Sequence, residues 1–260
     1  MTTIKKKVSI VFRIMDAITG KPVNKNLVKL YVNGVTVDTI HKNDGYTVVC
    51  NLPDDTYDFD IVSDVYQSDR ITVNTSDIDP LNPVLPVTLN PGMLYPGSSN
   101  LVLVHGKLDS SKKPFDQTDV LLVYSRNLEK IKIAQESVKK GSTRVKLYTT
   151  GKKDLAGRMF LIKDKDDVNS ELCRIISGPY DNDIYAFEHQ LSYTHKRGEM
   201  LKSAVKAYID GNGAFHARIH DIDKDDREAL IIIRVSGKVL HSESITLELG
   251  TDNNTGIIKF

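Results

Sequence analysis

The chain has 260 residues, of which 40% are hydrophobic and 27% charged, and its 35 basic and 34 acidic side chains leave a net charge of +1. These values are typical of globular proteins with two or three domains, and they exclude wholesale disorder. Nucleic acids and anionic membranes bind clusters of Lys and Arg, so this balanced composition predicts neither as a partner.

The first apolar run, within MTTIKKKVSIVFRIMD, follows three lysines as in a signal peptide. However, Val8, Ile10, Phe12 and Ile14 take every second position and Arg13 interrupts the run, a pattern that predicts a β-strand. No stretch of the chain is as long and apolar as a membrane span. We therefore expect a protein that is made in the cytoplasm without a signal peptide.

Runs of Val, Ile, Tyr and Thr continue along the chain with Gly, Pro, Asn or Asp between them, as in LVKLYVNG, YTVVCNL, TYDFDIV, LVLVHGKL and DVLLVYSRN. Residues 127–141 fit either a strand or a short helix that ends at Gly141, and we favour the strand. Residues 210–213, DGNG, predict the turn of a β-hairpin. Short strands separated by turns predict an all-β protein of tandem Ig-like β-sandwich domains.

The first third of the chain carries a recurring set of turn and strand residues. The set is Asp16, Thr19, Gly20, Pro22, Val23, Val28, Leu30, Asp44, Gly45, Tyr46, Leu52, Pro53, Thr56, Tyr57 and Tyr66. It resembles the prealbumin-like β-sandwich, a group that includes carboxypeptidase regulatory-like and collagen-binding B-type repeats, from Lys7 to about Asn90. This chain has Asp55 and Val65 where the group usually has Gly. The resemblance implies a spacer, stalk or docking module.

Proline marks the clearest domain boundary. Five of the nine prolines lie between residues 77 and 100: Pro80, Pro83, Pro86, Pro91 and Pro96. Because proline lacks a backbone donor and fixes φ, we expect a stiff connector there. We predict a prealbumin-like sandwich at 1–90, a Pro/Gly-rich linker at 91–100, a second β-rich domain at 101–179 and a third sandwich at 180–260. Whether 101–260 form one domain or two is left open.

Five aspartates gather in NDGYTVVCNLPDDTYDFDI, at positions Asp44, Asp54, Asp55, Asp58 and Asp60. The first three belong to turns. The last two alternate with apolar residues and should face solvent from a half-buried strand. No nucleophile or histidine accompanies them, so we predict no catalytic carboxylate pair.

Residues 221–228, DIDKDDRE, place acidic side chains at alternate positions as a calcium-binding EF-hand loop does. Asp226 and Ile232 stand where that loop needs Gly and Glu, so we predict a solvated hairpin tip. The tetrad at 223–226 echoes the one at 164–167, also ahead of an apolar run.

The remaining candidates are isolated. His216 and His220 share a predicted strand, where about 13 Å would separate them, too far to bind one zinc ion. His189 and His195 lack ligands at suitable spacing and are predicted to be exposed. Cys50 and Cys173 are predicted to be buried free thiols. The loops at 110–113, 139–141 and 151–153 are predicted to be solvated turns. We therefore predict no catalytic, cofactor-binding or metal-binding residue.

Two functions fit this architecture. The first is a non-enzymatic structural or docking protein in a larger homo- or hetero-oligomeric assembly, most typically a bacteriophage virion or tail component (baseplate, collar, fibre adaptor or decoration) or part of an injection apparatus. The alternative is a glycan-binding adhesion module with an aromatic face. The candidates for that face are Tyr180, Tyr185, Phe187 and Tyr193, although such residues more often fill a core.

Overall fold

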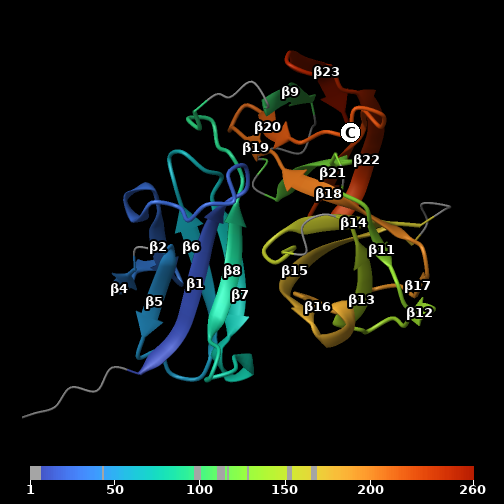
Figure 1. The fold of residues 1–260 in the computed structure, drawn as a ribbon. Coiled ribbons are helices and arrows are strands. Elements are labelled where there is room, and N and C mark those ends of the chain that lie inside the picture. The colour runs from blue at the N-terminus through green and yellow to red at the C-terminus, as the bar shows by residue number, and fades with distance from the viewer. Residues whose placement is uncertain are drawn as a thin grey trace, which may run out of the picture. The chain divides into compact units, whose positions relative to one another are not determined.

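The computed structural model describes residues 7–42, 44–96, 101–109, 115, 117–127, 129–150, 154–164 and 169–260. Apart from three short 3-10 turns, its regular elements are all β-strands, as predicted (Figure 1). The chain divides into two compact units, Met1–Tyr95 and Pro96–Phe260, which we call unit 1 and unit 2. No helix in the described ranges is long and apolar enough to cross a membrane.

Unit 1 is a sandwich of two four-stranded sheets. The first sheet contains, in order, β4 (Thr39–His41), β5 (Tyr46–Cys50), β1 (Val8–Asp16) and β8 (Val84–Leu89). The second contains β3 (Val35–Thr36), β2 (Lys29–Val32), β6 (Thr56–Val62) and β7 (Asp69–Asn74). The 3-10 turns η1 (Lys25–Leu27) and η2 (Thr75–Asp77) connect strands. β1 and β8 run parallel, and the other neighbours run antiparallel.

The core of unit 1 follows from the alternation of side chains along its strands. Every second residue of β1, including Phe12, is buried, and the ring of Phe12 lies 4.9 Å from that of Phe59 in β6. Asp58 and Asp60 occupy the alternate positions of β6, on the face opposite Phe59 and Ile61. The β-sandwich predicted for the first third is confirmed, while its membership of the prealbumin-like group stays a prediction.

The end of unit 1 differs from the predicted linker at 91–100. The backbone N–H of Gly92 donates to the carbonyl of Val65 at 2.9 Å, and the hydroxyl of Tyr95 donates to Asp16 Oδ2 at 2.8 Å. A Cβ atom on Gly92 would come within 2.8 Å of the backbone of Val65 and Tyr66, so the chain passes close to unit 1 here. Residues 91–95 are therefore a packed part of unit 1.

Unit 2 contains a ring of six strands, which we call the barrel. In order, the strands are β11 (Ile131–Ile133), β13 (Arg144–Thr149), β16 (Ile184–Phe187), β15 (Glu171–Tyr180), β14 (Met159–Lys163) and β18 (Met200–Lys206). β18 pairs back with β11 through Lys132 and Met200, which closes the ring. The ring encloses an apolar cluster that includes Phe160, Ile175 and Tyr185. The ribbon of β12 (Ser137–Val138) and β17 (His195–Lys196) and the 3-10 turn η3 (Asp181–Asp183) belong to the connections.

The rest of unit 2 is a second sandwich. From β18 the sheet continues into β10 (Thr118–Tyr124), β21 (Glu228–Val235) and β22 (Lys238–Thr246). The facing sheet contains β19 (Tyr208–Ile209), β20 (Ala214–His220), β9 (Leu101–Asp109) and β23 (Asp252–Lys259). Val104 and Phe215 of the facing sheet share a core with Leu122 and Ile231. In chain order the barrel is inserted between β10 and β19, and β18 serves both parts.

This topology bears on the predicted division of residues 101–260. A boundary between 179 and 180 would cut β15, whose residues Ile175 and Tyr180 pair with Phe187 and Ile184 of β16 inside the barrel. The strand predicted within 127–141 is confirmed by β11 and β12. The DGNG turn is also confirmed, because it joins β19 to β20 with Gly213 at a φ of 83°.

Candidate functional site

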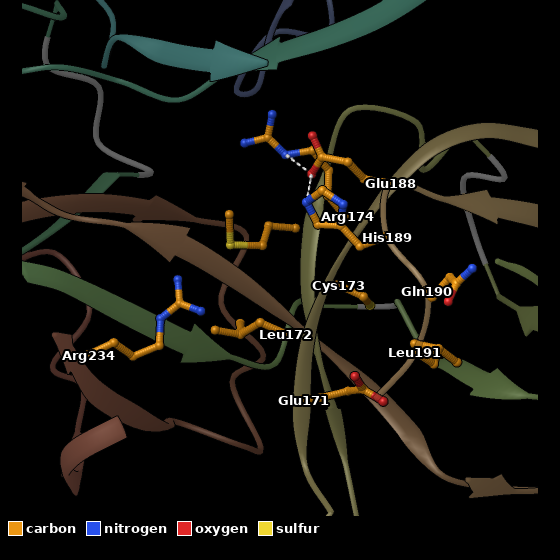
Figure 2. Close-up of a pocket in the computed structure, with 10 residues that line it drawn as sticks. Glu171, Leu172, Cys173, Arg174, Glu188, His189, Gln190, Leu191 and Arg234 are labelled. Carbon is orange, nitrogen blue, oxygen red and sulfur yellow. Dashed lines mark ion pairs between the residues drawn. The ribbon is translucent and has the colours of Figure 1, made fainter. Parts of the chain in front are cut away.

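A groove of about 240 Å³ runs along β15 in unit 2 (Figure 2). We call it the β15 groove, and ten residues line it: Met159, Glu171, Leu172, Cys173, Arg174, Glu188, His189, Gln190, Leu191 and Arg234. They come from β14, from β15, from the segment after β16 and from β21. Residues 188–191 directly follow β16 and line one edge of the groove, and we call them the rim.

Strand geometry explains the apolar part of the β15 groove. Cys173 and Ile175 of β15 point into the barrel core, so Leu172 and Arg174 point to the opposite face. Leu172 and Met159 pack against a small separate cluster of apolar residues that includes Leu161. The groove thus has an apolar surface beside its polar side chains.

The polar side chains of the groove are only partly paired with one another. Arg174 Nε lies 3.8 Å from Glu188 Oε2, and His189 Nε2 lies 3.9 Å from the same oxygen, as the dashed lines in Figure 2 show. The side chain of His189 is 83% exposed, which confirms its prediction as an exposed histidine. Arg234 Nη2 donates to Asp119 at 3.0 Å, whereas its buried Nε has no acceptor in the described protein.

Glu171 anchors the chain that follows the rim. Its Oε2 accepts the backbone N–H of Ser192 at 2.7 Å, and its Oε1 accepts that of Tyr193 at 3.1 Å. Its Oε1 also lies 2.7 Å from Nε2 of His195. Burial disfavours the carboxylate, but the hydrogen bonds from His195 and from both amides outweigh it and lower the pKa of Glu171.

His195 is fully buried, so the prediction of an exposed side chain is wrong. Its Nδ1 lies 2.6 Å from Glu199 Oε2, and the other oxygen of Glu199 accepts the backbone N–H of Lys196 at 2.9 Å. Burial favours the neutral ring, but the hydrogen bonds with Glu171 and Glu199 outweigh it and raise the pKa of His195. Glu199 lies four residues after His195, so the sequence could have suggested it as a partner of this histidine. Glu171 lies 24 residues before His195, and nothing in the sequence pairs the two.

The aspartates of the first third do not converge. Asp58 accepts a hydrogen bond from the hydroxyl of Thr72, Asp60 pairs with Arg70, and Asp55 accepts the backbone N–H of its neighbour. They belong to turns and to the outward face of β6, as the alternation of the sequence indicates.

The acidic tip at 221–228 is held by protein donors. Asp221 accepts from Arg126 at 2.8 Å, and Asp226 accepts from the hydroxyl of Ser125 at 2.6 Å and from Lys202 at 3.1 Å. In the part of the chain that the structure describes, no group of three or more His, Cys, Asp or Glu side chains is arranged to hold a metal ion. Of the similar tetrad at 164–167, only Asp164 lies within the described residues.

His216 and His220 lie on strand β20, as predicted. His216 packs against Tyr208 with ring centroids 5.0 Å apart, while Nδ1 of His220 lies 3.1 Å from Asp221. Burial, and then the nearby Arg126, lower the pKa of His220 to about 4. The two histidines therefore have separate surroundings.

The predicted aromatic face does not form. Tyr185 and Phe187 are buried in the barrel core, because every second side chain of β16 points inward. Tyr180 and Tyr193 are 47% and 41% exposed. Cys173 is buried as predicted, whereas Cys50 is half-buried. The loops at 110–113 and 151–153 lie outside the described residues.

No protein-family model and no curated protein matches the chain. Several solved structures show weak similarity, and three of them illustrate it. One, described as α-glucan recognition by family 41 carbohydrate-binding modules from streptococcal virulence factors, is 10% identical with a TM-score of 0.20, over 96% of this chain and 94% of that one. The Bacillus anthracis TIE protein is 11% identical with a TM-score of 0.24, over 97% and 50%. A streptococcal virulence factor described by its α-glucan binding is 12% identical with a TM-score of 0.20, over 96% and 93%. TM-scores this low do not indicate a shared function.

Proposed function

We propose that this chain is a binding protein whose unit 2 takes a neutral, polyhydroxylated ligand, a glycan, in the β15 groove. The observation that carries the proposal is the lining of the groove, where an apolar surface made by Leu172 and Met159 lies beside side chains that donate and accept hydrogen bonds. Sugar rings have apolar C–H faces and hydroxyl groups that both donate and accept, so this combination suits them.

The charges of the groove favour a neutral ligand. Arg174 lies near Glu188, Arg234 near Asp119 and Glu171 near His195, so each of these charged side chains has a neighbour of opposite charge. An anionic ligand would meet repulsion from both carboxylates, and a cationic one from both guanidinium groups. Hydroxyl groups can accept from the arginines and donate to Glu188 without burying a net charge.

The size of the groove limits the ligand. Its volume of about 240 Å³ is below the range of about 300–1,000 Å³ that is typical of drug-sized ligands. We therefore expect one or two sugar rings to be held directly, with the remainder of a longer chain extending into solvent. Binding should accordingly be modest, with a dissociation constant on the order of 0.1–1 mM for a short oligosaccharide.

Binding of the full chain to an array of defined oligosaccharides, followed by calorimetry with the best neutral one, tests this proposal. The variants Gln190→Ala and Glu188→Gln remove an amide or a carboxylate of the groove, and each should weaken binding about fivefold. Lys139→Ala, an exposed change outside the groove, is the control and should bind like the parent chain. Absence of any neutral ligand, or equal affinity in all variants, would overturn the proposal.

A docking role is the second candidate, and strand β22 is the observation that favours it. Among the described strands β22 pairs only with β21, and its residues Val239 and Leu240 are 59% and 44% exposed. An open strand edge with apolar side chains can add a strand from a protein partner. Light scattering tests this role by measuring the molar mass of the full chain and of its Val239→Lys variant. The role requires that the parent chain forms an oligomer and that the variant does not. A place in a virion, tail or injection apparatus stays a prediction.

A further inference from the structure

We propose that His195 is a positioning residue for the β15 groove. As an imidazolium between Glu171 and Glu199 it holds the rim in place, and loss of its proton at rising pH releases the rim and weakens glycan binding. This inference rests on the proposed function, and it adds a pH-dependent control of the same site.

The geometry requires a doubly protonated ring. Nε2 of His195 lies 2.7 Å from a Glu171 oxygen, and Nδ1 lies 2.6 Å from a Glu199 oxygen. An ionised carboxylate can only accept, so each ring nitrogen must donate, whereas a neutral imidazole has one N–H and one lone pair. Because the side chain of His195 has no exposed surface, water cannot reach the ring to replace the hydrogen bond that is lost with the proton.

The hydrogen bonds of Glu171 connect this ring to the rim. Glu171 holds the backbone of Ser192 and Tyr193, which directly follow the rim. The rim itself is joined to β15 through the N–H of Glu188, which donates to the carbonyl of Arg174 at 2.9 Å, and its last residue, Leu191, accepts from the N–H of Gly141 and donates to the carbonyl of Ser142. If a neutral His195 turned a lone pair toward Glu171 or Glu199, that carboxylate would move away from the ring, and residues 192–196 and the adjoining end of the rim would loosen.

The direction of the pH effect follows from the pKa shifts of His195 and Glu171. The pKa of His195 is raised above its ordinary value near 6.5, so its contribution is complete below that value and is lost as pH rises through the folded-state pKa. The pKa of Glu171 is lowered, so its contribution is lost only as pH falls through that lower pKa. His195 and Glu171 therefore both stabilise the rim at pH values between the lowered pKa of Glu171 and the raised pKa of His195.

The charged groups next to His195 in the sequence, and those that flank its paired strand β12, are exposed. Beside it on the chain are Lys196 and Arg197, and the paired strand β12 is flanked by Glu136, Lys139 and Lys140. The residues of β12 itself, Ser137 and Val138, carry no charge. Screening by solvent makes the exposed groups secondary to Glu171 and Glu199.

Two measurements on the full chain test the proposal. Nitrogen NMR of the imidazole should show His195 still protonated at both nitrogens at pH values above 6.5, the ordinary pKa of histidine. Hydrogen exchange of the backbone amides of residues 188–196 should then accelerate as the His195 proton is lost, after correction for the intrinsic pH dependence of exchange. In parallel, affinity for the array-selected oligosaccharide should fall about tenfold across the same pH range.

Glu199→Gln supplies the decisive control. Its amide oxygen can still accept from Lys196 and its NH₂ can donate to a neutral His195, so the ring keeps both partners without the extra proton. This variant should keep the rim ordered, and binding intact, over the pH range in which the parent chain loses the His195 proton, whereas His195→Gln should leave the rim loosened at every pH. A neutral His195 at about pH 6, pH-independent exchange, or the same pH profile in Glu199→Gln would overturn the proposal. If no oligosaccharide binds, the proposed function fails, and the exchange data still decide whether His195 holds the rim.

Discussion

Arg158 and Glu129 form a two-pronged ion pair, in which Nη1 and Nη2 of the guanidinium each lie 2.6 Å from a different carboxylate oxygen. Arg158 directly precedes β14, and Nη2 also donates to the hydroxyl of Ser203 in β18 at 3.0 Å. The side chains of the pair are only 15% and 11% exposed. This pair joins segments of the barrel close to β18, the strand that the barrel shares with the sandwich.

We expect Arg158→Met to lower the free energy of unfolding of unit 2 by about 3 kcal/mol, because it removes both short hydrogen bonds of the buried Glu129 carboxylate and leaves only Arg126, 3.9 Å away, as a cationic neighbour. Adding Glu129→Leu should recover most of that loss. Urea unfolding of the full chain measures both. Arg70→Met, which removes the exposed pair with Asp60, is the control and should cause no measurable change. Equal losses from the two arginine changes would contradict this expectation.

The buried carboxylate of Asp16 gives a second prediction. Its Oδ2 accepts the hydroxyls of Tyr66 and Tyr95 at 2.9 and 2.8 Å, and its Oδ1 accepts the backbone N–H groups of Ile18 and Thr19. Asp16→Ala should destabilise unit 1 by about 3 kcal/mol and Tyr95→Phe by about 1 kcal/mol. Thermal unfolding followed by circular dichroism measures the difference, and a larger loss from Tyr95→Phe would contradict it.

The same tyrosines predict loss of stability at alkaline pH. Burial, and then the hydrogen bond to Asp16, raise the pKa of Tyr95 to about 12, and the pKa of Tyr66 is raised for the same reasons. A raised tyrosine pKa favours the folded chain below the unfolded value near 10, and this contribution is lost between about pH 10 and about pH 12. Absorbance at the tyrosinate band should show both groups titrating late, and Tyr95→Phe should remove one of them.

Gly92 gives a steric prediction. A Cβ atom there would meet the backbone of Val65 and Tyr66 at 2.8 Å, which neither can relieve by a side-chain movement. We expect Gly92→Ala to destabilise unit 1 by about 2 kcal/mol and to expose Tyr95. Gly211→Ala is the matched control, because a Cβ atom there would meet nothing within 4 Å. Equal stabilities of the two variants would contradict the close approach.

The two cysteines should differ in reactivity. Cys173 is buried in the barrel, and burial raises the pKa of its thiol, whereas Cys50 is half-buried. Alkylation of the native chain should therefore modify Cys50 first, and Cys173 only when unit 2 unfolds. Mass spectrometry after a timed reaction separates the two products. Modification of Cys173 at the rate of Cys50 would show that the barrel opens readily.

The local pattern of the sequence was enough to predict these strands, turns and solvent-facing side chains. Asp58 and Asp60 could be placed on a polar face because Phe59 and Ile61 stand between them, and DGNG could be assigned to a hairpin because its turn needs positive φ. Both inferences use neighbours in the sequence. The packing of residues 91–95 was missed, because the partner of Tyr95 is Asp16, at the opposite end of unit 1.

The β15 groove could not be predicted for the same reason. Its lining joins Leu172 and Arg174 with the rim and with Arg234 of a strand outside the barrel. The closure of the barrel depends on Lys132 meeting Met200, and the surroundings of His195 depend on Glu171. Such pairings follow from how the chain returns on itself, which alternation along single strands does not encode.

Strand β23 pairs in parallel with β9, so the first and last strands of unit 2 are neighbours. During synthesis β9 gains this partner only after Asp252–Lys259 have emerged, whereas the described strands of unit 1 have all been made once Leu89 has emerged. Truncation before Asp252 would remove β23 and leave one edge of β9 unpaired, and an unpaired edge can aggregate with other chains. Unit 2 therefore cannot complete this sheet until two strands from distant parts of its sequence have both been made.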